Sequence, residues 1–110
     1  MINKFLQKIK RYRNDEDINI IELNNILKIN NECILLDVRS LQEYEEGHLT
    51  GATNIPLYEL EQCCDCKLKD KEKTIIVYCQ SGIRSKKAIN ILKKNGFKNL
   101  YHLKGGLDEI

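Results

Sequence analysis

A chain of 110 residues with 42% hydrophobic residues is long enough to bury one modest core, which argues against a second domain. Its 18 basic and 16 acidic residues are interspersed and leave a net charge of +2, so we expect neither nucleic acid nor a membrane as a partner. The sequence has no apolar run suited to a signal peptide or a bilayer-spanning helix, and its odd number of cysteines, 5, fits a reducing compartment. We therefore expect a cytoplasmic protein.

Strands are predicted to alternate with helices along most of the chain. Residues 1–17 are expected to form an N-terminal extension, with apolar residues at the spacing of a short surface helix over 3–13. The domain itself is expected over residues 18–110. Alternation of this kind predicts an α/β fold with a central, mostly parallel, five-stranded sheet and helices on both faces. The predicted strands cover residues 18–21, 33–38, 53–55, 74–78 and 100–103, and the predicted helices cover residues 22–29, 40–46, 57–67 and 85–95.

Two of the predicted helices carry recognisable end sequences. Ser40 and Glu43 have the spacing of a capping box, which starts a helix, and Gly47 can end that helix. Gly96 stands where a glycine would end the helix over 85–95.

The most informative segment of the chain is the loop after the strand over 74–78. Cys79 follows that strand directly, and Gly82 and Arg84 come next, before a helix predicted to start at Ser85. The free backbone N–H groups and the positive dipole end of a helix stabilise an anion. The same geometry favours the thiolate form of a cysteine, which is its nucleophilic form.

Other polar residues are expected near this loop. Asp37 and Arg39 come at the end of the strand over 33–38, and the carboxyl ends of parallel strands meet at one edge of a sheet. A structural ion pair between them is favoured over a direct contact of Arg39 with substrate. His48 follows a glycine in a predicted turn, so a hydrogen bond to the backbone is favoured over a role as general base.

Five short motifs lie in order along the chain. They are Leu-Asp-Val-Arg at 36–39, Glu-Tyr at 43–44, Gly-His-Leu-Thr-Gly-Ala-Thr-Asn-Ile-Pro at 47–56, the cysteine loop, and Leu-Lys-Gly-Gly at 103–106. At these spacings the chain resembles the rhodanese-like single-domain sulfurtransferases from Ile18 to Gly106. The resemblance implies that Cys79 is the catalytic cysteine and that residues 80–84 form an anion cradle. Ile110 departs from the pattern, because many members carry a tryptophan there.

The expected chemistry is transfer of a sulfane sulfur. A Cys79 thiolate attacks the outer sulfur of thiosulfate or another persulfide donor, and cyanide or a thiol then removes the sulfur. Gly82 lets the loop curl so that its N–H groups converge, and Arg84 offers a planar cation to an anionic donor. Neither a cofactor nor a metal is expected, and a protein donor or acceptor stays open. The other candidates for substrate binding are Gln80, Ser81, Ile83 and Ser85, with an N-cap as the alternative role of Ser85.

Two alternative functions stay open. Cysteine-dependent phosphatases and arsenate-handling enzymes of similar geometry resemble the pattern Cys-x5-Arg, whereas four residues separate Cys79 from Arg84 here. The shorter loop favours sulfur over phosphate, and the sequence identifies no acid for a leaving oxygen. A non-catalytic module for protein interaction or sulfur carriage is the other alternative.

A second group of cysteines has Cys-x-x-Cys spacing. Zinc would need a partner chain, because no second pair follows and Cys33 starts a buried strand. Cys64 falls in the apolar period of the helix over 57–67 and is expected in the core. Cys63 and Cys66 are expected to be exposed, and either acceptance of sulfur from Cys79 or a disulfide under oxidation stays open for them.

Overall fold

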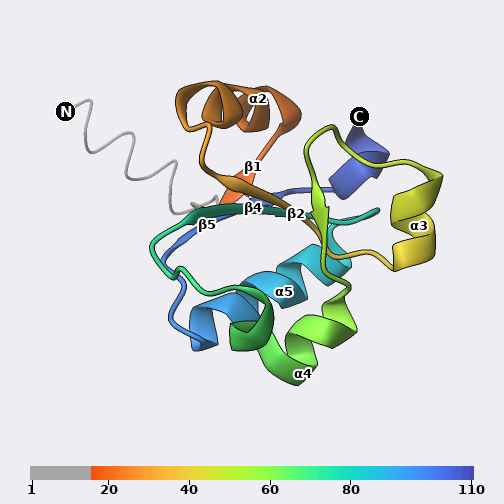
Figure 1. Cartoon of the computed structure of the whole chain (residues 1–110). Coiled ribbons are helices and arrows are strands. Elements are labelled where there is room, and N and C mark those ends of the chain that lie inside the picture. Colours follow the sequence, from red (N-terminus) through yellow and green to blue (C-terminus); the bar gives the residue numbers. More distant parts are fainter. Residues whose placement is uncertain (1–15) are drawn as a thin grey trace.

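A five-stranded sheet with helices on both faces forms the domain, as Figure 1 shows for the computed structural model. The strand order is β1-β5-β4-β2-β3, and every neighbouring pair is parallel, which confirms the predicted α/β fold. The structure describes residues 16–110, so the helix predicted over 3–13 lies outside it, and the division at residue 18 stays a prediction. The elements are β1 (Asp17–Ile18), α2 (Ile20–Ile29), β2 (Ile34–Asp37), α3 (Leu41–Glu46), β3 (Thr53–Asn54), α4 (Leu57–Lys67), β4 (Thr74–Tyr78), α5 (Ile83–Lys94), β5 (Asn99–Leu103) and the 3-10 helix η1 (Gly106–Glu109).

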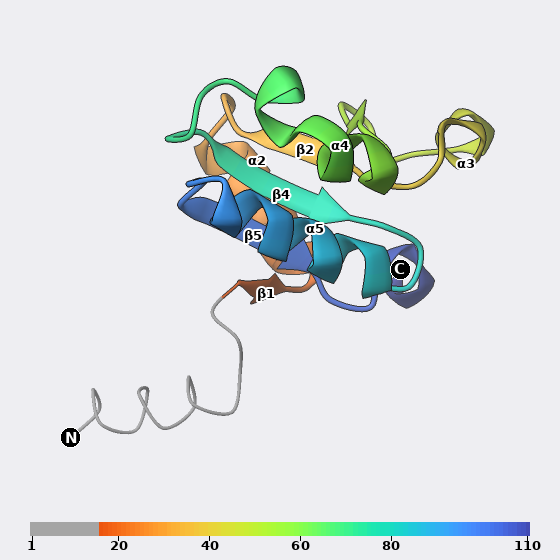
Figure 2. The same cartoon turned by 90° about the horizontal axis from the view of Figure 1, so that it is seen from below.

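The central strand β4 divides the core into two layers. Its side chains alternate between the faces, and Ile75 and Val77 pack on the side of α4 and α5. Ile76 and Tyr78 pack on the side of α2. Figures 1 and 2 show α4 and α5 together on one face of the sheet and α2 on the other. Burial on both faces explains why β4 and β2 are almost continuously apolar in sequence.

The first predicted strand is longer than the one that forms. β1 ends at Ile18, and α2 begins at Ile20, where residues 18–21 were expected to be extended. The reason is a capping box: the Glu22 N–H donates to the Asn19 side chain at 2.9 Å, and the Glu22 carboxylate accepts from the Asn19 N–H at 3.1 Å. Capping by Asn19 therefore turns the chain into a helix two residues earlier.

Two helix starts bear on the cysteine loop. Ser40 caps α3 with the predicted capping box to Glu43, and Gly47 ends α3 as expected. α5 begins at Ile83, with Gly82 as its N-cap at φ 97°, so the alternative role of Ser85 as N-cap is wrong. Glycine suits this cap because a left-handed backbone is costly for other residues.

Helix α4 is irregular near its cysteines. Cys63 has non-helical dihedrals, φ −159° and ψ 87°, which kink the helix inside the range predicted from the sequence. None of the helices in the part of the chain that the structure describes has both the length and the apolar character to cross a membrane.

Candidate functional site

The thiol of Cys79 lies in a cradle of backbone N–H groups at the carboxyl end of β4. Its Sγ accepts hydrogen bonds from the N–H of Gly82 at 3.1 Å and the N–H of Ser85 at 3.3 Å. Both donors lie at the N-terminus of α5, Gly82 as its N-cap and Ser85 in its first turn, where the free N–H groups and the dipole favour negative charge. Cys79 itself is fully buried. Negative charge on this sulfur is therefore met directly by backbone N–H groups.

The C-terminal segment, which includes η1, forms hydrogen bonds to the backbone of the cysteine loop. The N–H of Leu107 donates to the carbonyl of Cys79 at 3.0 Å, and the N–H of Asp108 donates to the carbonyl of Gln80 at 2.9 Å. A Cβ atom on Gly106 would lie 2.5 Å from the Cys79 carbonyl oxygen and 2.6 Å from that of Gln80. The second glycine of the Gly-Gly motif thus makes room for the loop. The side chain of Gln80 adds a bond to Asp108 at 2.7 Å, so it faces η1.

Arg84 reaches across the loop to helix α3. Its guanidinium makes two bonds to the Glu43 carboxylate, at 2.6 and 2.9 Å. These bonds hold the pKa of Glu43 at about 2, well below its usual value, and raise the pKa of Arg84. Both side chains are about one-third exposed. Arg84, the cation that was expected to face an anionic donor, is therefore already bound to a carboxylate. Ser81 and Ile83, in the same segment, are exposed.

Asp37 and Arg39 form a buried ion pair at the end of β2. The Arg39 side chain donates to both Asp37 oxygens, with the shortest contact at 2.7 Å, and its Nη2 also donates to the Gly47 carbonyl at 2.6 Å. The Arg39 N–H adds a bond to Asp37 at 2.9 Å. Because the pair joins β2 to the turn after α3, it fixes the loops at this edge of the sheet.

His48 lies in the turn after α3. Its Nδ1 is 2.8 Å from the carbonyl oxygen of Tyr44, and its ring stacks on that of Tyr44 with centroids 3.8 Å apart. The imidazole is exposed and bound to its own turn.

A histidine that the sequence analysis passed over lies behind the cradle. His102 on β5 is buried, and its Nδ1 is 2.8 Å from the hydroxyl of Ser85. That hydroxyl is also 3.6 Å from the Sγ of Cys79. The Nε2 of His102 lies 3.7 Å from a carboxylate oxygen of Asp17 on β1. A sequence clue existed: His102 is two residues from the apolar Leu100, so the two side chains lie on the same face of the strand, and both are buried.

The other cysteines are distant from Cys79 in sequence, and they differ in whether their thiols are free or in a disulfide. Cys63 and Cys66 form a disulfide, so neither thiol is available to accept sulfur until the bond is reduced. Cys64 is buried as expected, and its burial raises the pKa of its thiol. Among residues 16–110 no group of three or more His, Cys, Asp or Glu side chains is arranged to hold a metal ion.

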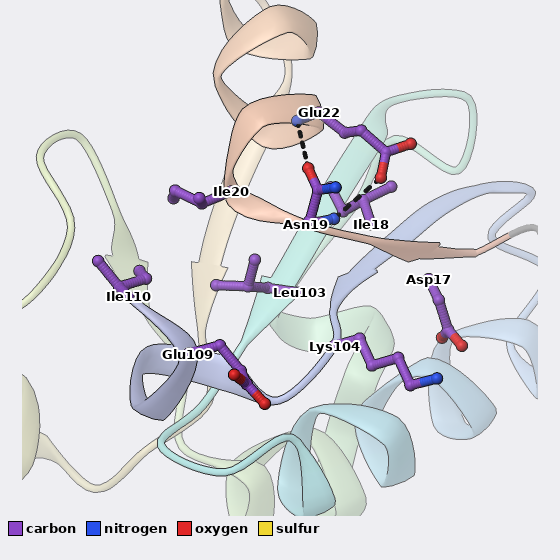
Figure 3. A pocket seen from close by; sticks show the side chains of 9 residues that line it. All are labelled: Asp17, Ile18, Asn19, Ile20, Glu22, Leu103, Lys104, Glu109 and Ile110. Carbon is purple, nitrogen blue, oxygen red and sulfur yellow. Dashed lines mark hydrogen bonds between the residues drawn. The ribbon is translucent and has the colours of Figure 1, made fainter.

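Two hollows lie near the edge formed by β1 and β5. The first, shown in Figure 3, has a volume of about 440 Å³, with Ile20, Leu103 and Ile110 as apolar lining. The second has a volume of about 450 Å³ and lies beside the cysteine loop, where it reaches His102. Asp17 borders both hollows. The second hollow is further lined by Ser81, Gly82, Ile83, Lys86, Lys87, Asn90 and Lys104.

The fold has counterparts in known proteins. The family model of the rhodanese-like domain matches residues 6–110. The chain belongs to the rhodanese-like family. Its fold is shared with the human single-domain sulfurtransferase TSTD1, with a TM-score of 0.74 at 25% identity over 86% of this chain and 93% of that one. A rhodanese-related protein from Thermoplasma volcanium gives a TM-score of 0.72 at 30% identity over 86% of this chain and 88% of that one.

Curated relatives of this rhodanese-like chain carry a different name. A tRNA uridine(34) hydroxylase of Hamiltonella defensa is 38% identical over 92 residues, which is 80% of this chain and 26% of that protein. The rhodanese-like chain therefore spans about a quarter of the length of the curated relatives it matches.

Proposed function

We propose that this rhodanese-like chain is a sulfurtransferase that carries a sulfane sulfur as a persulfide on Cys79. One observation carries the proposal: the Sγ of Cys79 accepts two backbone N–H groups, from Gly82 and Ser85, at the start of α5. Converging N–H groups stabilise both a thiolate and the anionic outer sulfur of a persulfide. The donor is thiosulfate or another persulfide donor, and the acceptor is cyanide or a thiol. A protein can serve as the persulfide donor or as the thiol acceptor. A thiol acceptor fits the cytoplasmic location that belongs to this proposal.

The reaction consists of two displacements at sulfur. The Cys79 thiolate attacks the outer sulfur of thiosulfate, a new S–S bond forms, and the old S–S bond breaks with its electron pair leaving on sulfite. The acceptor then attacks the outer sulfur of the persulfide, and the Cys79 thiolate leaves. Each step moves negative charge from one sulfur to the next inside the same cradle. Backbone donors suit such a site because they need no proton transfer of their own.

The acid–base groups near the loop favour sulfur transfer over phosphate hydrolysis. A phosphatase needs an acid to protonate the leaving oxygen. Glu43 is the carboxyl group bound to Arg84, and its pKa of about 2 keeps it ionised at neutral pH. It therefore has no proton to give. The four-residue spacing between Cys79 and Arg84 supports the same conclusion.

Incubation with thiosulfate is expected to add one sulfur atom to the peptide that carries Cys79. Mass spectrometry of the intact protein and of its peptides measures the adduct, and Cys79→Ser is the control that should gain none. Thiocyanate formed on addition of cyanide shows turnover. A persulfide that forms and passes to neither cyanide nor a thiol would favour the carrier module. Hydrolysis of an aryl phosphate without any sulfur adduct would contradict sulfur transfer.

Arg84→Ala is expected to raise the KM for thiosulfate roughly tenfold, because a hydrogen bond to a charged group contributes about 1.5–3 kcal/mol. The KM for an uncharged organic persulfide should change little. Glu43→Gln is the matched variant: it weakens the hold on the guanidinium, so the KM for thiosulfate should fall. Steady-state kinetics with both donors measures these changes. Equal losses with both donors in Arg84→Ala would mean that Arg84 serves the shape of the loop.

Action on tRNA is a second candidate, favoured by the name of the curated relatives. It would require nucleic acid as a partner, against the expectation from the small net charge of +2. The lysines that could meet phosphates beside the loop are Lys86, Lys87 and Lys104. We expect the chain to bind tRNA only at low salt, since few phosphate contacts give weak, salt-sensitive binding. A binding titration with tRNA at several salt concentrations decides, and tight binding at physiological salt would favour this candidate.

A further inference from the structure

A line of four polar groups runs from the reactive sulfur to the edge of the sheet. It starts at the Sγ of Cys79, passes through the hydroxyl of Ser85 at 3.6 Å, and reaches the Nδ1 of His102 after a further 2.8 Å. The opposite nitrogen of that ring, Nε2, faces a carboxylate oxygen of Asp17 at 3.7 Å. Cys79, Ser85 and His102 are all buried, so water competes little for these contacts.

The hydroxyl of Ser85 has one proton, and this restricts how the line can be protonated. When Cys79 is a thiol, its S–H donates to the Ser85 oxygen. The Ser85 O–H then has two acceptors within reach, the carbonyl of Gly82 at 3.1 Å and the Nδ1 of His102 at 2.8 Å. When it donates to Nδ1, the ring proton is left on Nε2, toward Asp17. When Cys79 is a thiolate, the line can reverse: the Ser85 O–H turns to the sulfur, and Nδ1–H donates to the Ser85 oxygen. The two arrangements differ by the transfer of one proton.

We propose that His102 is a positioning residue that takes the thiol proton of Cys79 through the hydroxyl of Ser85, while Asp17 stabilises the imidazolium that forms. The S–H bond of Cys79 breaks as its proton goes to the Ser85 oxygen, and the original Ser85 proton goes to the Nδ1 of His102. The products are a thiolate and an imidazolium, so net charge is conserved. In the second half of the reaction, the acceptor thiol loses its own proton to solvent and takes the sulfur, which releases Cys79 as a thiolate. The proton on His102 can then return to Cys79 through the hydroxyl of Ser85.

The surroundings of His102 suit a group that starts neutral. Burial lowers the pKa of His102, and Lys86 on α5 and Lys104 after β5 lower it further. The carboxylates of Asp17 and Glu16, at the start of the sheet, act in the opposite direction. A neutral imidazole can accept the thiol proton at neutral pH, and the nearby carboxylates limit the cost of the charge that results. His48 has neither burial nor a link to the cysteine loop.

The outer end of the line has access to solvent. Asp17 and His102 both border the hollow of about 450 Å³ beside the cysteine loop. The Asp17 side chain is 18% exposed, whereas that of His102 is 7% exposed. A proton held on His102 can therefore exchange with water at the Asp17 end, away from the sulfur. This route lets the cradle exclude water from Sγ without trapping the proton.

The inference rests on the proposed function only in taking Cys79 as the reactive thiol, and its test needs no sulfur donor. NMR titration of the two imidazoles is run on the protein before and after alkylation of Cys79 with iodoacetamide. Alkylation removes the ionisable thiol, so the titration midpoint of His102 should shift by roughly half a pH unit or more. The midpoint of His48 should stay where it was, as an internal control. An unchanged His102 midpoint would overturn the proposal.

Variants give a second, independent measurement. His102→Gln keeps a polar group beside Ser85 but cannot hold the proton, and Ser85→Ala breaks the line. Both should slow alkylation of Cys79 at neutral pH about tenfold and move its pH profile toward alkaline pH. Ser85→Thr keeps the hydroxyl and should restore the rate, while Tyr101→Phe changes the neighbouring strand position and should leave the rate unaltered. Equal alkylation rates and pH profiles in wild type and in folded His102→Gln would overturn the proposal even if persulfide forms normally.

Discussion

Arg39→Met is expected to lower the free energy of unfolding by about 3–5 kcal/mol, the usual cost of removing one partner from a buried ion pair. Asp37 is fully buried, and the guanidinium of Arg39 binds both of its carboxylate oxygens. Methionine matches the aliphatic stem of arginine, so the packing of that stem is largely kept. The dominant effect is a buried carboxylate without its cation. Chemical denaturation followed by circular dichroism measures the loss.

The matched control is the double variant Asp37→Leu with Arg39→Met. It removes both charges, and replacing a buried pair with apolar residues of similar size is often nearly neutral. We therefore expect the double variant to be more stable than Arg39→Met alone, a reversal that simple loss of packing would not produce. If the single change costs less than about 1 kcal/mol, or if the double variant is the less stable of the two, the pair does not hold this edge of the sheet in the way described.

Local sequence patterns predicted the elements of this fold well where one segment decides its own structure. β4 was found at its correct bounds because its apolar residues are buried on both faces. The capping box of Ser40 and Glu43 marked the start of α3 correctly. The equivalent box of Asn19 and Glu22 starts α2 at Ile20, so the first strand is shorter than the predicted residues 18–21. The sequence therefore contains the information needed to place the boundary between β1 and α2.

The supports of the cysteine loop could not be predicted in the same way. Arg84 and Glu43 are 41 residues apart, and Ser85 and His102 are 17 residues apart. Each of these pairs forms because parallel strands bring their carboxyl ends to one edge, and the sequence alone does not say which side chains will meet there. The strand order places β5 beside β4, which brings His102 behind the cradle. The sequence located Cys79 through its own neighbours, whereas the groups that act on it come from distant segments.

Gly106→Ala is the change expected to damage the site most without touching the thiol itself. The new Cβ would lie 2.5 Å from the carbonyl oxygen of Cys79 and 2.6 Å from that of Gln80, and both of these atoms belong to the backbone. The loop and η1 must therefore move apart, which weakens the bonds that the N–H groups of Leu107 and Asp108 make to the loop. Displacement of a reacting group by about 1 Å can cost a hundredfold in rate. We expect a loss of that size in the rate of persulfide formation from thiosulfate.

Gly51→Ala separates this contact from backbone strain. Gly51 also has a left-handed backbone, φ +83° against +63° for Gly106, but a Cβ atom there would meet nothing within 4 Å. Both variants therefore carry the cost of a left-handed alanine, about 1–2 kcal/mol, which thermal unfolding reports. Only Gly106→Ala should also slow persulfide formation and alkylation of Cys79, because only there does the added methyl group press on the loop. Equal rates in the two folded variants would show that η1 does not shape the cradle, and that the Gly-Gly motif serves the chain's C-terminal turn alone.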